Sequence, residues 1–220
     1  MRISDYIVKH LEDIGIKYVF GVTGGGAAGL NDAFALSKKI KYISCHHEQG
    51  AGNAAIGYAK QTGKLAVVNP TTGCGGTNCI TSVLDAWQDS VPVLFLSGNV
   101  ALKHTIHHLG NIGMRQLGIQ ENDIIPIVKP ITKFASMISN PNATLCVLQK
   151  AIYTATSLRK GPVWLDVPSD IQGQVMKEED FSPYIQQDSS RSDICNQLRM
   201  DAYTLLFFSL LYLLNPSPTP

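Results

Sequence analysis

The chain has 220 residues, of which 45% are hydrophobic and 16% are charged, and its net charge at pH 7 is +1. This composition is typical of a folded domain with a sizeable apolar core, and it excludes a disordered chain. So small a net charge offers no broad basic surface to nucleic acid. The longest apolar run, residues 205–214, is about half the ~20 residues that a membrane-spanning helix needs, so no membrane span is expected.

The first predicted element is a helix that Ser4 caps. Apolar residues recur at helical spacing over residues 6–14, and Gly15 ends the pattern. Strands are then expected near residues 18–22, 41–45, 65–69, 91–97, 132–138 and 163–167. Helices are expected near residues 27–37, 49–62, 76–88 and 143–158. This alternation predicts an α/β fold with an open parallel sheet and helices on both of its faces.

Glu48 is the leading candidate for a functional residue. It follows the predicted strand at residues 41–45 and precedes a helix of small residues. Ligands of open α/β sheets bind at the carboxyl ends of strands, although a glutamate here could instead only stabilise the helix N-terminus. Two glycine clusters, at residues 24–26 and 73–76, also follow predicted strands, and they allow the backbone to approach a ligand or a partner closely.

The order and spacing of these motifs resemble the pyrimidine-binding half of thiamine-diphosphate enzymes. The likeness rests on residues 18–27, 47–59, 71–78 and 85–92, and it continues through residues 116–121, 127–133 and 161–168 in the manner of acetolactate synthase-like enzymes. It covers about residues 1–175, which we expect to form a pyrimidine-binding domain with the fold of this family. Residues 176–220 are expected to be an appended or truncated tail, irregular or helical.

The resemblance implies the role of Glu48. The matching glutamate of the family hydrogen-bonds N1′ of the aminopyrimidine and promotes the imino tautomer that removes the thiazolium proton. Gly24 and Gly25 match a loop over the active site, where a side chain would collide with cofactor or substrate. An ordinary tight turn is the other interpretation of these two glycines.

The second glycine cluster and a later glutamine complete the set of residues that the resemblance suggests. Thr72, Gly73 and Asn78 match the loop that packs beside the pyrimidine ring. Cys74 stands where the family pattern has proline, which leaves the rigidity of this loop open. Gln120 matches a glutamine that faces the substrate, although it could also be an exposed loop amide.

The implied activity is that of an acetolactate synthase-like enzyme, which decarboxylates a 2-oxo acid such as pyruvate and transfers the carbanion to an acceptor. The family holds the diphosphate and Mg²⁺ in a separate domain with a Gly-Asp-Gly motif, which this sequence lacks. The chain is therefore expected to bind the pyrimidine end of thiamine diphosphate, with Mg²⁺ only through a missing or partner domain. Its expected partner is a second copy of itself or a chain carrying the diphosphate-binding domain, and activity of the chain alone is left open.

Two alternatives remain. The chain could be a non-catalytic truncated domain that only oligomerises. It could also be an NAD-binding Rossmann domain, because residues 24–29 satisfy G-x-G-x-x-G and Glu48 follows at the interval expected for a ribose-binding acid. The second glycine cluster speaks against the Rossmann interpretation, which leaves it unexplained.

The histidines and cysteines carry weaker signals. His107 and His108 resemble a histidine pair of decarboxylases in the same superfamily, and proton transfer, metal binding or simple exposure are all open for them. We predict no metal ligands in the chain itself. The five cysteines lack C-x-x-C spacing and no apolar signal segment opens the sequence, so a cytoplasmic location is expected.

Overall fold

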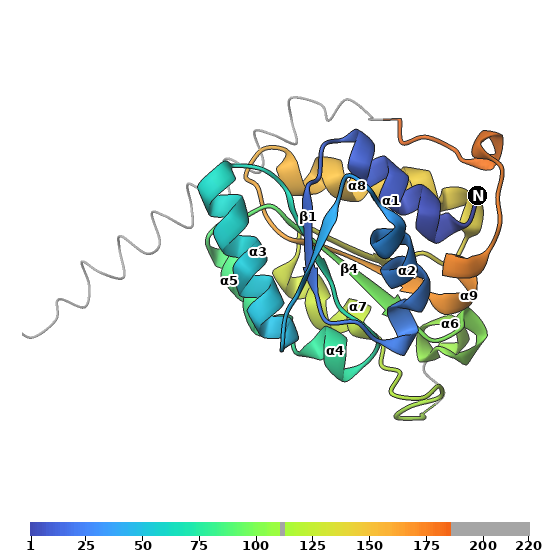
Figure 1. Cartoon of the computed structure of the whole chain (residues 1–220). Coiled ribbons are helices and arrows are strands. Elements are labelled where there is room, and N and C mark those ends of the chain that lie inside the picture. Colours follow the sequence, from blue (N-terminus) through green and yellow to red (C-terminus); the bar gives the residue numbers. More distant parts are fainter. Residues whose placement is uncertain (111–112, 186–220) are drawn as a thin grey trace, which may run out of the picture. The chain divides into compact units, whose positions relative to one another are not determined.

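The computed structural model describes residues 1–110 and 113–185. Within these residues, six parallel strands form one sheet in the order β2-β1-β3-β4-β6-β5 (Figure 1). The strands are β1 (Tyr18–Gly21), β2 (Lys41–Ser44), β3 (Ala66–Asn69), β4 (Val93–Asn99), β5 (Phe134–Met137) and β6 (Val163–Pro168). The predicted open parallel sheet is therefore confirmed, and each strand lies where the sequence placed it.

Helices cover both faces of the sheet, as predicted. The α-helices are α1 (Ile3–Asp13), α2 (Ala28–Leu36), α3 (Glu48–Thr62), α4 (Cys74–Thr77), α5 (Ile80–Gln88), α6 (Ile106–Leu109), α7 (Ile124–Val128), α8 (Thr144–Thr156) and α9 (Ser169–Gly173). The first core cluster joins α1, α2 and α8 to one face of the sheet, and the second joins α3, α5 and α7 to the other (Figure 1). Burial of both faces explains why inner strands such as β3 and β4 are nearly continuous apolar runs, whereas the edge strand β2 is only partly buried.

Two sequence predictions about helices were wrong in detail. Ser4 does not cap α1, because the N-cap is Arg2 and Ser4 lies buried inside the first turn. The carbonyl of Gln174 accepts a hydrogen bond from the backbone N–H of Ile3 at 2.9 Å, so one free N–H of the helix end is satisfied without a serine cap. The helix predicted at residues 76–88 is split into α4 and α5, which are separated by two turn residues, Asn78 and Cys79.

The strand order creates a crevice between β1 and β3. From β1 the chain passes outward to β2 at the sheet edge and then returns to β3 on the other side of β1. Connections that leave two adjacent strands in opposite directions open a crevice at their carboxyl ends, where ligands of open α/β sheets bind. Both glycine clusters follow these two strands.

The first residues of the predicted tail pack on the domain. The ring of Phe181 stacks on Tyr6 of α1 with 3.9 Å between ring centroids. Residues 186–220, which include most of the predicted tail and its apolar run at 205–214, lie outside the described residues. The domain boundary at residue 175 stays a prediction. In the described part of the chain, no helix combines the length and apolar character needed to cross a bilayer.

Candidate functional site

Glu48 lies at the carboxyl-end edge of the sheet with its side chain turned inward. It is the first residue of α3, and only 8% of its surface is exposed. The preceding residue, His47, caps the helix, because its Nδ1 accepts a hydrogen bond from the backbone N–H of Gln49 at 3.1 Å. The Glu48 carboxylate is therefore not needed as the cap. Its Oε2 accepts a hydrogen bond from Nδ2 of Asn78 at 2.9 Å, which joins two predicted site residues.

The second glycine loop, residues 71–76, is shaped by close contacts on both sides. A Cβ on Gly75 would lie 3.2 Å from Oε1 of Glu48. Gly73 has φ +64°, and a Cβ there would lie 1.8 Å from the backbone oxygen of Gln120. Gln120 itself has φ 58°, which is uncommon for a residue with a side chain. Gly73 is thus required by its own conformation and by the approach of the segment that carries Gln120.

The first glycine loop contacts the second one directly. A Cβ on Gly24 would lie 2.5 Å from the side chain of Thr71, and one on Gly26 would lie 1.8 Å from Oγ1 of Thr72. A Cβ on Gly25 would meet nothing within 4 Å. The chain's own packing therefore requires glycine at positions 24 and 26, whereas the missing side chain at Gly25 only keeps space open.

That space is part of a cavity of about 520 Å³ at the carboxyl ends of the strands. Four predicted residues line it, namely Gly24, Gly25, Thr72 and Gln120. The other three predicted residues, Glu48, Gly73 and Asn78, are not part of this lining and lie with the second glycine loop. The structure therefore brings the predicted residues to one edge of the sheet, in two groups that meet at residues 71–76.

Thr71 is a lining residue that the sequence analysis did not select. Its hydroxyl is buried and has no hydrogen-bond partner among the described residues. A buried polar atom without a partner is uncommon in folded proteins and points to a water or a ligand group. Adjacent threonines in one loop gave no means of choosing between Thr71 and Thr72. His104 and Asn99 also line the cavity, and no sequence motif distinguished them.

Two other ionisable groups lie near Glu48, and both stay neutral at pH 7. Burial raises the pKa of the Cys79 thiol well above its ordinary value, and the charge of Glu48 raises it further. Burial, with smaller contributions from the charges of Cys45 and Glu48, raises the pKa of Tyr42 to about 12. Neither group can therefore take up a proton in competition with Glu48.

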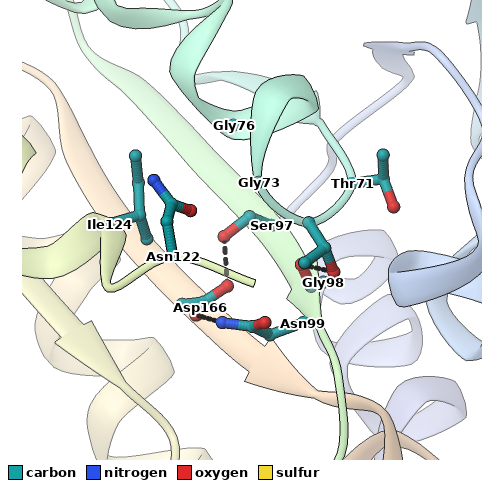
Figure 2. A pocket seen from close by; sticks show the side chains of 10 residues that line it. Thr71, Gly73, Gly76, Ser97, Gly98, Asn99, Asn122, Ile124 and Asp166 are labelled. Atoms are coloured by element: carbon teal, nitrogen blue, oxygen red, sulfur yellow. Dashed lines mark hydrogen bonds between the residues drawn. The ribbon is translucent and has the colours of Figure 1, made fainter. Parts of the chain in front are cut away.

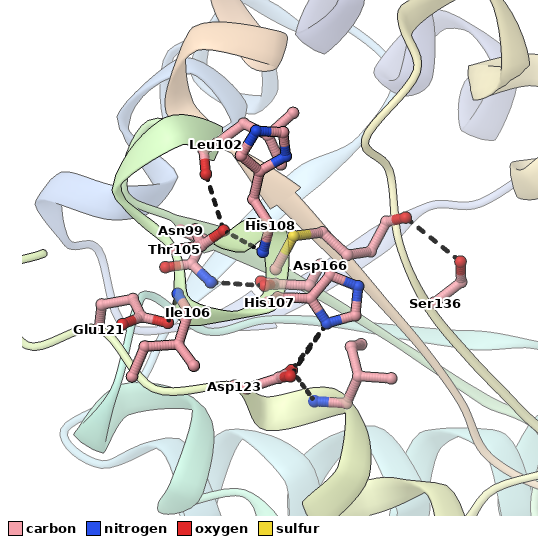
Figure 3. A network of polar contacts seen from close by, with 12 residues as sticks. Asn99, Leu102, Thr105, Ile106, His107, His108, Glu121, Asp123, Ser136 and Asp166 are labelled. Atoms are coloured by element: carbon pink, nitrogen blue, oxygen red, sulfur yellow. Dashed lines mark hydrogen bonds and ion pairs between the residues drawn. The ribbon is translucent and has the colours of Figure 1, made fainter. Parts of the chain in front are cut away.

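The histidine pair is separate from this cavity. His107 and His108 belong to α6, and Nδ1 of His107 lies 3.0 Å from a carboxylate oxygen of Asp123 (Figure 3). Neither residue lines the cavity, whereas His104 does. Across residues 1–110 and 113–185, no group of three or more His, Cys, Asp or Glu side chains is arranged to hold a metal ion.

Comparison with known proteins agrees with this fold. The family model of the thiamine pyrophosphate enzyme N-terminal TPP binding domain matches residues 1–122, which contain all of the predicted site residues. The chain belongs to the thiamine pyrophosphate enzyme family. Its described sheet, with helices on both faces, is the α/β fold of that family.

Acetolactate synthases are among the relatives of the chain. The chain is 39% identical over 166 residues to the acetolactate synthase large subunit of Corynebacterium glutamicum, a match that covers 76% of this chain and 25% of the relative. It is 38% identical to the acetolactate synthase of Mycobacterium bovis over 76% of this chain and 26% of that enzyme. The large subunit from Lactococcus lactis is 36% identical over 76% of this chain and 28% of that subunit. The chain thus spans about a quarter of the length of the curated relatives it matches.

Proposed function

We propose that this member of the thiamine pyrophosphate enzyme family supplies the pyrimidine-binding half of an acetolactate synthase-like active site. The complete enzyme would decarboxylate a 2-oxo acid such as pyruvate and transfer the carbanion to an acceptor. The observation that carries the proposal is the buried Glu48 carboxylate, which Asn78 holds at 2.9 Å beside the second glycine loop. A carboxylate is seldom buried without a partner or a function.

The residues present fit the uncharged end of thiamine diphosphate placed between Glu48 and the cavity, because Gly75 lies beside both Thr71 of the cavity lining and Oε1 of Glu48. The cavity volume of about 520 Å³ lies in the usual range for small-molecule sites. Its lining offers the unpartnered hydroxyl of Thr71 and the open space at Gly25. The described lining contains no lysine or arginine, which suits an aminopyrimidine better than a diphosphate. We therefore propose that the diphosphate and Mg²⁺ are held by a partner domain.

Thiamine diphosphate, when bound, supplies a thiazolium ring that acts as an electron sink. The proposed role of Glu48 is to exchange a proton with the pyrimidine nitrogen N1′. Asn78 fixes Oε2, and no hydrogen bond from the described part of the chain reaches Oε1, so one carboxylate oxygen stays available. Gly75 leaves room beside that oxygen, since a Cβ there would lie only 3.2 Å away.

The decisive variant is Glu48→Gln, measured in a complex with a chain that carries the diphosphate-binding domain. The substitution is nearly isosteric, so the fold should be kept. Exchange of the thiazolium C2 proton for deuterium should slow about 10² to 10⁴-fold, the usual contribution of general acid–base assistance. Gln120→Ala is the matched control, because Gln120 lines the cavity and is proposed to meet the substrate. Exchange at the parent rate in Glu48→Gln, together with its loss in Gln120→Ala, would refute the assigned roles.

Assembly is the second part of the proposal. Leu84 and Trp87 of α5 are 40% and 39% exposed, and they lie on a helix that packs beside α3. A Cβ on Gly57 of α3 would meet nothing within 4 Å. We propose that this face pairs with a second copy or with a diphosphate-domain chain. Monomeric elution at high concentration, with no capture of a diphosphate-domain chain, would contradict this.

The NAD-binding alternative is distinguished by binding. Thiamine diphosphate with Mg²⁺ should bind the reconstituted complex, whereas NADH should show no fluorescence enhancement. Enhancement of NADH fluorescence without thiamine diphosphate binding would favour the Rossmann alternative.

We also propose a cytoplasmic location, because the four cysteines in the described residues are all free thiols.

A further inference from the structure

Asp166 is a buried carboxylate that the proposed chemistry does not use. It lies in β6, and only 1% of its surface is exposed. Its two oxygens accept hydrogen bonds from neighbouring β4, one from Oγ of Ser97 at 2.5 Å and one from Nδ2 of Asn99 at 2.6 Å (Figure 2). Both carboxylate oxygens are thus bound to residues on either side of Gly98.

Gly98 is the point where β4 contacts both glycine loops. Successive residues of a strand face opposite sides of the sheet, so Gly98 faces away from Asp166. A Cβ on Gly98 would lie 2.2 Å from the backbone oxygen of Gly26. The Gly98 carbonyl accepts a hydrogen bond from Oγ1 of Thr72 at 3.1 Å, and its N–H donates to the carbonyl of Pro70 at 3.1 Å. A shift of Gly98 would therefore move both loops.

The donors that hold Asp166 are themselves fixed. Oδ1 of Asn99 accepts a hydrogen bond from the backbone N–H of Val100 at 2.8 Å, so its Nδ2 must point toward Asp166. Oγ of Ser97 accepts a hydrogen bond from the indole N–H of Trp164 at 2.8 Å, which leaves its own proton for Asp166. A carboxylate, which only accepts hydrogen bonds, is the side chain that satisfies both donors at once.

We propose that Asp166 is a positioning residue that holds Gly98 against the two glycine loops and thereby sets the geometry of the site. The link continues from Thr72 along the second loop to Gly75, beside the carboxylate of Glu48. The consequence for cofactor binding rests on the proposed function. The effect of Asp166 on the geometry of the two loops is independent of the proposed function.

The test uses the full chain, labelled with ¹⁵N, and reads the loops by NMR. In Asp166→Asn, one of the two donors loses its acceptor. The amide resonances of Gly26, Thr72 and Gly75 should therefore shift, and hydrogen exchange at the Gly98 amide should accelerate about tenfold or more, as expected for a lost hydrogen bond to a charged group. The matched control is Asp13→Asn, whose side chain in α1 is 58% exposed. That variant should leave these signals unchanged.

A reciprocal exchange separates positioning from general loss of stability. Asn99→Asp alone places two carboxylates together and should disturb the loops more than Asp166→Asn. The double variant Asn99→Asp with Asp166→Asn restores one carboxylate and one amide, because the carboxylate introduced at position 99 can accept from both the Val100 N–H and the amide introduced at position 166. Loop resonances and Gly98 exchange should return toward the parent values. A double variant that folds but shows no recovery would overturn the proposal.

Two further outcomes keep this proposal distinct from the proposed function. Unchanged loop resonances in Asp166→Asn would overturn the positioning role even if the reconstituted complex binds thiamine diphosphate. Loop shifts with recovery in the double variant would support the role even if thiamine diphosphate does not bind. If Asp166→Asn fails to fold, Ser97→Ala removes one donor alone and should produce smaller shifts at the same loop residues, and their absence would overturn the proposal.

Discussion

Two glycines of α3 should respond in opposite ways to the same substitution. Gly57 faces open space, since a Cβ there would meet nothing within 4 Å. Gly52 faces α5, where a Cβ would lie 2.5 Å from Cβ of Ser82 and 2.6 Å from its Oγ. Ser82 cannot turn away easily, because it is fully buried and its hydroxyl bonds the carbonyl of Gln49 at 3.0 Å and Oδ1 of Asn53 at 2.8 Å.

The expected change in the free energy of unfolding follows from comparing Gly57→Ala with Gly52→Ala. Alanine is favoured over glycine inside a helix by about 0.8–1.0 kcal/mol, and both variants gain this term. Gly57→Ala should therefore raise the free energy of unfolding by roughly that amount. Gly52→Ala must also separate α3 from α5, and overpacking of this kind costs about 1–3 kcal/mol. The difference between the two variants should equal this overpacking cost, because the helix propensity cancels.

Urea unfolding followed by circular dichroism measures this difference, provided that the m-value is the same in both variants. The measurement should be repeated at two protein concentrations, so that any contribution of self-association is detected. Gly52→Ala should also weaken the contact of Glu48 with Asn78, because Glu48 opens the same helix. Equal stabilisation by both substitutions would refute the reasoning from the short distance between Gly52 and Ser82.

Three other variants test the core and its buried charge. Burial raises the pKa of Asp166 from an ordinary 3.8 to about 6, although the hydrogen bonds from Ser97 and Asn99 lower it. The charge of Asp123 raises this pKa a little further and His107 lowers it. Because the folded state holds the proton more tightly, the free energy of unfolding should fall by up to about 3 kcal/mol as the pH rises from about 4 to about 6. Urea unfolding across this pH range should show a smaller fall in the free energy of unfolding in Asp166→Asn than in the parent. An equal fall in both proteins would contradict the assignment of this pH dependence to Asp166. Leu148→Ala in α8 empties a fully buried position and should cost about 2.7–5 kcal/mol in the same assay, with a cost below about 1 kcal/mol contradicting close packing there. Trp164→Phe can keep the ring stack but loses the indole hydrogen bond, so a loss of about 1–3 kcal/mol is expected and no loss would mean that the bond contributes little.

The sequence alone predicted the sheet because its inner strands β3, β4 and β6 are buried on both faces. Such strands are short apolar runs, and their limits are local features of the chain. β4 is buried at each of its seven positions, so its extent could be predicted without knowing its neighbours. The glycine clusters and Glu48 could be found for the same reason, since a strand end followed by small residues is visible in order along the chain.

Contacts between residues that are distant in the sequence decided the features that the sequence did not predict. Glu48 and Asn78 are 30 positions apart, and Asn78 lies in the break between α4 and α5 that helical periodicity did not predict. Ser4 is an acceptable cap by residue type, but the packing of α1 buries it, and a carbonyl from a distant segment satisfies the helix end instead. Propensity is a weak preference that tertiary contacts override.

Asp166 marks the limit of what the sequence by itself determined. Within the chain it is one acidic residue in an apolar run, and its donors Ser97 and Asn99 lie 69 and 67 positions away. The sequence determined that strands β4 and β6 exist, because burial depends on residues that are near each other in the chain. Only the tertiary structure decided that the two strands are neighbours in register, and that register brings the carboxylate to both donors around Gly98.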